Sequence, residues 1–141
     1  MNAAVVQICA DPRLSHDVVR LQVQQRLERM SLQADRIFLL NEIGGNLGSN
    51  MQNTVEMLQQ ERQRIVLAAV LHHDDCIAFK AGLRVPLERS VSGLSTYLAS
   101  RSITCPVLSG QIETENSAVT WSDEPRPNYE SFNFRMPRMG I

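Results

Sequence analysis

Short, almost uninterrupted apolar runs recur along the chain and alternate with segments whose apolar residues repeat every three or four positions. The runs cover residues 4–8, 36–40 and 65–71. Continuous apolar runs of this length are typical of parallel strands that are buried on both faces. The pattern therefore predicts three neighbouring strands of one sheet.

Three amphipathic helices are expected beside these strands. The first begins at Ser15, which is a good N-cap, the second covers residues 50–62 and the third covers 86–101. The order of elements is strand, helix, strand, helix, strand, helix. That order predicts right-handed crossover connections and a mostly parallel sheet.

The last periodic part of the chain predicts more strand. Residues 103–111 favour a fourth strand, which Pro106 should confine to a sheet edge because proline cannot donate a ladder hydrogen bond. The stretches 112–114 and 119–121 indicate a terminal hairpin. The predicted fold class is thus α/β, with a mostly parallel four-stranded sheet flanked by helices and a C-terminal hairpin or edge strand, in one domain over residues 1–123.

The composition changes at residue 124. Residues 124–141 show no periodicity, yet they hold Tyr129, Phe132 and Phe134, and a purely solvated tail would be poor in aromatic residues. We expect an irregular C-terminal arm that docks either on a partner subunit or on its own subunit. The sequence favours neither alternative.

Charge and cysteine content restrict the class of function. The net charge is -1, and the 14 basic residues are scattered, with Lys80 the only lysine, so neither nucleic-acid binding nor a polybasic membrane patch is expected. No apolar run approaches the length of a membrane span. Three cysteines, without an apparent secretory start, predict a cytoplasmic protein whose thiols serve metal or redox chemistry.

Two apolar runs end in residues that can bind a soft metal ion. Cys9 follows the first run, and His73 and Cys76 follow the third. Open α/β sheets bind their ligands at the carboxyl ends of the strands, and thiolate and imidazole are zinc ligands. We therefore expect these three residues to form a zinc site, with the adjacent His72 as a less favoured alternative ligand.

Asp11 decides what such a site can do. A zinc site with three protein ligands keeps a position for water and is of the catalytic kind, whereas four protein ligands usually mark a structural site. Asp11 could close the site as a fourth ligand. Alternatively Arg13, two residues on, could hold the carboxylate aside through a bidentate ion pair, so that it accepts a hydrogen bond from water instead.

These motifs resemble those of a known family. Residues 9–13, Cys-Ala-Asp-Pro-Arg, resemble the Cys-x-Asp-x-Arg signature of the β-class carbonic anhydrases, and 73–76, His-Asp-Asp-Cys, resemble their His-x-x-Cys signature. Residues 41–45 are similar to the family's Asn-Ala-Gly-Gly loop, and 107–121 are similar to its terminal hairpin. The resemblance covers most of the chain.

The resemblance implies a sheet of strand order 2-1-3-4 and a homodimer or a higher homo-oligomer. It also implies reversible hydration of carbon dioxide to bicarbonate, with a zinc-bound water as the nucleophile. The implied zinc ligands are Cys9, His73 and Cys76, the implied catalytic dyad is Asp11 and Arg13, and the implied lining of the substrate cleft includes Gly44, Gly45 and Ile77.

Three positions depart from the family pattern. Ile77 stands where glycine is usual, Asp74 where a small hydroxyl residue is usual, and Pro12 where serine is common. A bulky Ile77 would narrow the pocket, and a negative Asp74 would repel bicarbonate. Two alternatives therefore stay open: a catalytically degenerate, zinc-stabilised relative that acts through its interactions, and a hydrolase of carbonyl sulfide or carbon disulfide on the same site.

Overall fold

The computed structural model describes residues 1–124, which form one five-stranded sheet with helices on both faces. The strands are β1 (Asn2–Cys9), β2 (Arg36–Glu42), β3 (Arg64–His73), β4 (Val107–Ile112) and β5 (Val119–Trp121). The helices are α1 (His16–Arg29), α2 (Ser49–Gln60), α3 (Ile77–Lys80) and α4 (Leu87–Ser100), with a short 3-10 turn, η1 (Ile43–Gly45). The predicted α/β class is confirmed.

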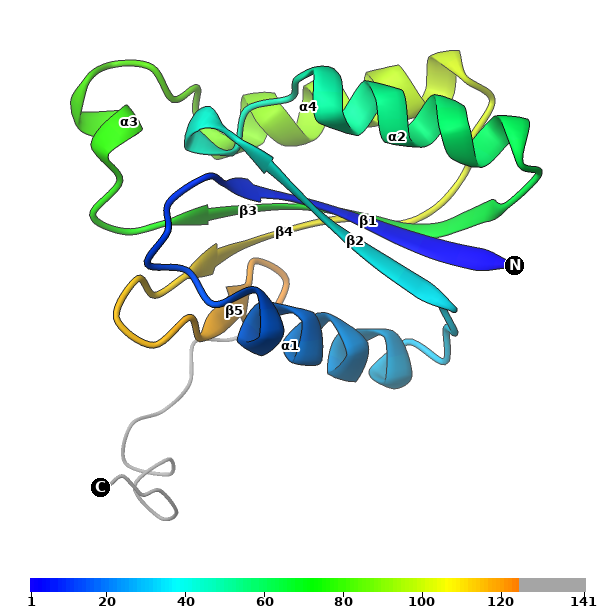
Figure 1. Cartoon of the computed structure of the whole chain (residues 1–141), viewed down its shortest axis with the longest axis horizontal. Coiled ribbons are helices and arrows are strands. Elements are labelled where there is room, and N and C mark those ends of the chain that lie inside the picture. Colours follow the sequence, from blue (N-terminus) through cyan, green and yellow to red (C-terminus); the bar gives the residue numbers. More distant parts are fainter. Residues whose placement is uncertain (125–141) are drawn as a thin grey trace.

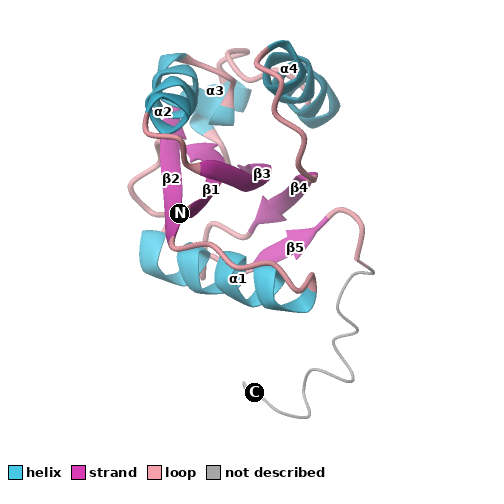
Figure 2. Cartoon of the chain, turned by 90° about the vertical axis from the view of Figure 1, so that its right-hand side faces the viewer, coloured by secondary structure: helices cyan, strands magenta, loops and turns pink. Residues whose placement is uncertain are grey.

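The sheet lies between two helical layers. Helix α1 covers one face, and α2 and α4 lie together on the other, as Figures 1 and 2 show from two directions. Val19, Val23 and Leu27 of α1 join one core cluster, and Leu58 of α2 and Leu94 of α4 join the other. Because β1 and β3 are buried by both layers, nearly all of their residues must be apolar, which explains their continuous apolar runs.

The predicted strand order 2-1-3-4 is confirmed, and β5 extends it to β2-β1-β3-β4-β5. Strands β1 to β4 pair in parallel, and β5 pairs antiparallel to β4. The chain passes from β1 outward to β2 and then crosses back to β3 on the other side of β1. The carboxyl ends of β1 and β3 therefore flank the switch point of the sheet, where such folds bind ligands.

Two strand predictions need correction. Strand β3 continues through His73, whereas the apolar run predicted an end at residue 71, because β4 offers partners to both histidines: His72 pairs with Gln111 and His73 with Ile112. The fourth strand begins only at Val107 and is internal, since β5 occupies the edge. Pro106 lies just outside it, so its missing N–H interrupts no ladder bond.

The N-terminus of α1 is fixed by local hydrogen bonds. The Ser15 hydroxyl accepts a hydrogen bond from the Val18 amide, which confirms the predicted N-cap. The Ser15 amide in turn donates to the Ser117 hydroxyl, so the cap joins the hairpin that ends in β5. The connection from β1 to α1, which carries Asp11 and Arg13, is thus held at its α1 end.

The predicted arm lies almost wholly outside the described residues, and the division of the chain at residue 124 stays a prediction. Within residues 1–124, no helix is long and apolar enough to span a bilayer.

Candidate metal centre

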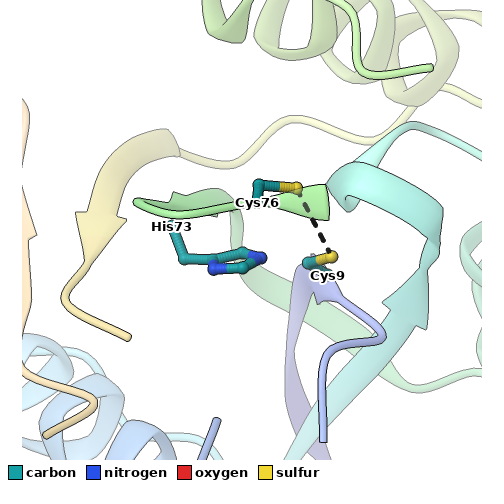
Figure 3. Close-up of side chains that lie close together, drawn as sticks. All are labelled: Cys9, His73 and Cys76. Atoms are coloured by element: carbon teal, nitrogen blue, oxygen red, sulfur yellow. Dashed lines mark hydrogen bonds between the residues drawn. The ribbon is translucent and has the colours of Figure 1, made fainter. Parts of the chain in front are cut away.

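Three side chains converge where β1 and β3 end. One ligand atom from each of Cys9, His73 and Cys76 lies within 4.8 Å of the others. Figure 3 shows the imidazole of His73 directed toward the two sulfur atoms. The three residues are between 1% and 7% exposed, so the group is shielded from bulk water.

The alternation of side chains along β3 separates the two adjacent histidines. Leu71 belongs to the core under α1 and Val70 to the core under α2 and α4. Successive residues of a strand point to opposite faces, so His73 shares a face with Leu71 and His72 shares one with Val70. The convergent group contains His73 and not His72. Burial lowers the pKa of His72 to about 4, so this ring is neutral.

A tight turn returns the chain after β3 so that Cys76 comes back to the site. Asp75 adopts a left-handed conformation with φ of 51°, which aspartate tolerates better than most residues. Cys76 then caps α3, and its Sγ lies 4.0 Å from Sγ of Cys9. Burial raises the pKa of the Cys9 thiol, and the neighbouring Cys76 raises it further. Two thiolates this close repel each other, and a bound cation would offset the free-energy cost of that repulsion.

Burial lowers the pKa of His73, so its imidazole is neutral and has one donor and one acceptor nitrogen. Nδ1 lies 2.9 Å from the hydroxyl of Thr114, while Nε2 has no hydrogen-bond partner within residues 1–124. A buried polar atom without a partner is uncommon and costs free energy. A soft metal ion bound by the two free thiols would give this unpaired Nε2 a partner.

The side chains of Asp11 and Arg13 form a bidentate ion pair. Arg13 Nε donates to Asp11 Oδ1 at 3.0 Å, and Nη2 donates to Oδ2 at 2.6 Å. These bonds lower the pKa of Asp11 to about 2. The carboxylate is thus ionised and held beside the convergent group, with its Oδ2 3.9 Å from Nε2 of His73.

Arg13 also ties the loop after β1 to the loop after β3. Its Nη1 donates to Oδ2 of Asp75 at 2.8 Å, and its Nη2 donates to the Asp75 carbonyl at 2.9 Å. Asp75 accepts a further bond from Lys80 in α3. Sequence analysis missed this link, because Asp75 lies 62 residues from Arg13 and no local pattern connects them.

The two glycines expected in the cleft are packed against the centre. Gly44 and Gly45 both have positive φ, of 66° and 71°, which only glycine adopts readily. A Cβ on Gly45 would lie 3.2 Å from the His72 ring and 3.7 Å from the Cys9 amide nitrogen. The absence of a side chain therefore lets the η1 turn approach the ends of both central strands.

Ile77 and Asp74, the two residues near Cys76 that differ from the family pattern, do not lie as expected. Ile77 is 71% exposed, so it fills no buried space. The carboxylate of Asp74 is engaged with Thr114, whose amide and hydroxyl contact Oδ1 at 2.6 and 2.8 Å. The expected repulsion of bicarbonate is therefore weakened, because Thr114 donors offset the charge of Asp74.

A groove of about 670 Å³ lies at the opposite end of the sheet. Asn2 and Arg64, at the starts of β1 and β3, line it together with Cys105. None of the predicted site residues is among its lining residues. The candidate chemistry thus belongs to the buried group at the carboxyl ends of the strands and not to this groove.

Comparison with solved structures identifies the fold. A carbonic anhydrase from Streptococcus mutans superposes with a TM-score of 0.56 at 16% identity, over 84% of this chain and 80% of that chain. A Coccomyxa β-carbonic anhydrase in complex with acetazolamide gives a TM-score of 0.60 at 14% identity, over 93% and 76%. A β-carbonic anhydrase from Aspergillus fumigatus gives 0.53 at 11% identity, over 88% and 76%.

No protein-family model matches the chain, and no curated protein matches it by sequence. The chain therefore has the fold expected from its motifs, that of the β-carbonic anhydrases, at low sequence identity. Within this fold, the described residues place a buried group of two cysteines and one histidine that is compatible with a metal ion.

Proposed function

We propose that this chain, which shares the fold of the β-carbonic anhydrases, binds zinc through Cys9, His73 and Cys76 and catalyses the reversible hydration of carbon dioxide. The observation that carries the proposal is the convergence of these three side chains beside the Asp11 and Arg13 ion pair. The donor set supports zinc, because thiolate and imidazole nitrogen are its usual ligands in proteins. When bound, zinc would supply the Lewis acidity that lowers the pKa of water.

In this proposal Asp11 orients the attacking water. Its Oδ2 accepts a hydrogen bond from Arg13 and lies 3.9 Å from Nε2 of His73, so the same oxygen is near enough to the proposed zinc to accept a hydrogen bond from a bound water. A carboxyl with a pKa of about 2 is too weak a base to store the proton, so orientation is the better-supported role. Water adds its oxygen to the carbon of carbon dioxide, and bicarbonate and one proton leave.

Arg13 restrains Asp11 in this scheme. Because both carboxylate oxygens accept from the guanidinium, the carboxylate cannot turn fully toward the thiols without losing these bonds. That restraint favours a site with three protein ligands over one closed by Asp11. It therefore supports the catalytic alternative over a purely structural zinc site.

The test is a metal analysis combined with a stopped-flow assay of carbon dioxide hydration. The proposal expects one zinc per chain and a hydration rate that disappears when a chelator removes the metal and returns with zinc. Zinc at full occupancy without hydration between pH 6 and 9 would overturn the enzymatic proposal and favour the degenerate relative. Under the same conditions, hydrolysis of carbonyl sulfide without hydration of carbon dioxide would favour the alternative of a hydrolase of carbonyl sulfide or carbon disulfide.

A further inference from the structure

Thr114 is a buried residue that follows β4 and contacts both a predicted ligand and the loop after β3. We propose that Thr114, held by Asp74, is a positioning residue that fixes His73 in the tautomer protonated at Nδ1 and so reserves Nε2 for the metal. The inference rests on the proposed function in one respect, since it takes His73 as a metal ligand.

A count of hydrogens supports this assignment. A threonine hydroxyl has one hydrogen to donate and two lone pairs that accept. The Thr114 hydroxyl lies within hydrogen-bond distance of the Asp74 carbonyl and 2.8 Å from Asp74 Oδ1. A backbone carbonyl can only accept, so the single hydrogen is directed to Asp74.

Toward His73 the same hydroxyl must then accept. Its oxygen is 2.9 Å from Nδ1, so that nitrogen carries the ring hydrogen. In a neutral imidazole the other nitrogen is unprotonated, which leaves a lone pair on Nε2. Nε2 of His73 is buried and has no hydrogen-bond partner within residues 1–124, and His73 belongs to the convergent group.

The surroundings hold Thr114 in this role. The Thr114 amide donates to Asp74 Oδ1 at 2.6 Å, and the Asp74 amide donates to the Ile112 carbonyl at 3.3 Å. These bonds join the loop after β3 to the end of β4. Thr114 is only 8% exposed, so water competes little for its hydroxyl. Partners of this kind fix the orientation of metal-binding histidines and raise metal affinity.

The first experiment measures zinc affinity by competition with a chromophoric chelator. Thr114→Val removes the hydroxyl with little change in shape, Thr114→Ser retains it, and Thr120→Val removes a hydroxyl from β5 as a matched control. We expect Thr114→Val to bind zinc about tenfold more weakly, as is typical when such a partner is lost, and the other two to match the wild type. Equal affinity in Thr114→Val and the wild type would overturn the inference.

The second experiment reads the tautomer directly in the metal-free protein. A long-range ¹H–¹⁵N correlation spectrum should show His73 protonated at Nδ1 in the wild type and in Thr114→Ser, and a mixture of tautomers in Thr114→Val. A wild-type His73 protonated at Nε2 would overturn the inference, even if Thr114→Val did not fold. A purely structural threonine would leave the tautomer unchanged.

The outcomes separate this inference from the proposed function. Zinc affinity and tautomer are measured without carbon dioxide, so a chain that shows the Thr114 effect but no hydration refutes the function alone. If the Thr114→Val variant binds zinc as tightly as the wild type and hydrates carbon dioxide as fast, the inference is refuted and the proposed function is not.

Discussion

Oδ2 of Asp11 lies 3.9 Å from Nε2 of His73, while Nη2 of Arg13 donates to the same oxygen at 2.6 Å. The carboxylate therefore faces the candidate metal position but is bonded to the guanidinium. Its pKa of about 2 keeps it ionised at any pH at which the protein would work. For the proposed zinc site, this arrangement favours Asp11 as a hydrogen-bond acceptor over Asp11 as a fourth ligand.

The first prediction concerns Asp11→Asn. The amide is similar in shape but carries no charge, and its NH₂ group would oppose the Arg13 donors. We expect the variant to retain zinc and to lose about a hundredfold in hydration rate, a loss typical of a reacting group that is no longer held in the right orientation. Stopped-flow kinetics and metal analysis test this together. Asp17→Asn is the matched control, since that side chain is 99% exposed at the start of α1; unchanged turnover in Asp11→Asn would remove Asp11 from the mechanism.

The second prediction concerns the thiols. Cys76→Ser should bind zinc far more weakly than the wild type, because a hydroxyl is a poor zinc ligand, whereas Cys105→Ser should bind normally, because Cys105 lies outside the convergent group. Metal content after dialysis measures the difference. Zinc should also stabilise the wild type by about 2.7 kcal/mol at a free concentration one hundred times its Kd. Full occupancy in Cys76→Ser would mean that the ligand set is wrong.

The sequence predicted the elements that burial determines. Strands β1 and β3 are covered on both faces, so their apolar runs could be read directly from the sequence. Parallel pairing placed the candidate ligands Cys9 and His73 together at the carboxyl ends of these strands. Ser15 was identified as the cap of α1 from its residue type and its position before the periodic apolar segment. These features depend on interactions that are local in sequence or on a single periodicity.

The missed features depend on pairs that are distant in sequence. The end of β3 could not be located, since two histidines look like a polar turn until Gln111 and Ile112 of β4 pair with them. The contact between His73 and Thr114 spans 41 residues, and no pattern within the hairpin marks that threonine. Such contacts are set by tertiary packing, which a single sequence does not reveal.

The third prediction concerns the ion pair that anchors the hairpin to α1. The carboxylate of Asp123 accepts a bond of 3.0 Å from the largely buried Arg26, whose guanidinium also lies 5.7 Å from the Trp121 ring centre. Asp123→Asn should lower the free energy of unfolding at pH 7 by about 1 kcal/mol, a value reduced for the exposure of the carboxylate. Urea unfolding measures the change, with Glu113→Gln in the same hairpin as the control.

This loss of stability should depend on pH. Arg26 lowers the pKa of Asp123 below its ordinary value of 3.8, so between those two values the unfolded chain binds more protons than the folded one. The stabilisation is therefore complete above pH 3.8 and decreases as the pH falls through the lowered pKa. The difference between the wild type and Asp123→Asn should shrink in that acid range. A difference that is the same at pH 7 and in strong acid would exclude the ion pair as its cause.

The fourth prediction separates backbone strain from packing at Gly45. Gly45→Ala and Gly82→Ala both place a side chain on left-handed backbone, with φ of 71° and 74°, and each should lose about 1 kcal/mol on that account. A Cβ on Gly82 would meet no atom within 4 Å, whereas a Cβ on Gly45 would lie 3.2 Å from the His72 ring and 3.3 Å from the Leu71 carbonyl. The second contact is with the backbone of the central strand β3, which can shift little.

Gly45→Ala should therefore be destabilised by about 1 kcal/mol more than Gly82→Ala in urea unfolding, as is usual for overpacking in a tight core. It should also bind zinc more weakly, because a Cβ on Gly45 would lie 3.7 Å from the amide nitrogen of Cys9, so a shift of the η1 turn would disturb that residue. Gly82→Ala should bind zinc as the wild type does. Equal losses of stability in the two variants would mean that the η1 turn can move away from β3 at no cost in free energy. The close approach of Gly45 to β3 would then not be needed for the geometry of the candidate metal centre.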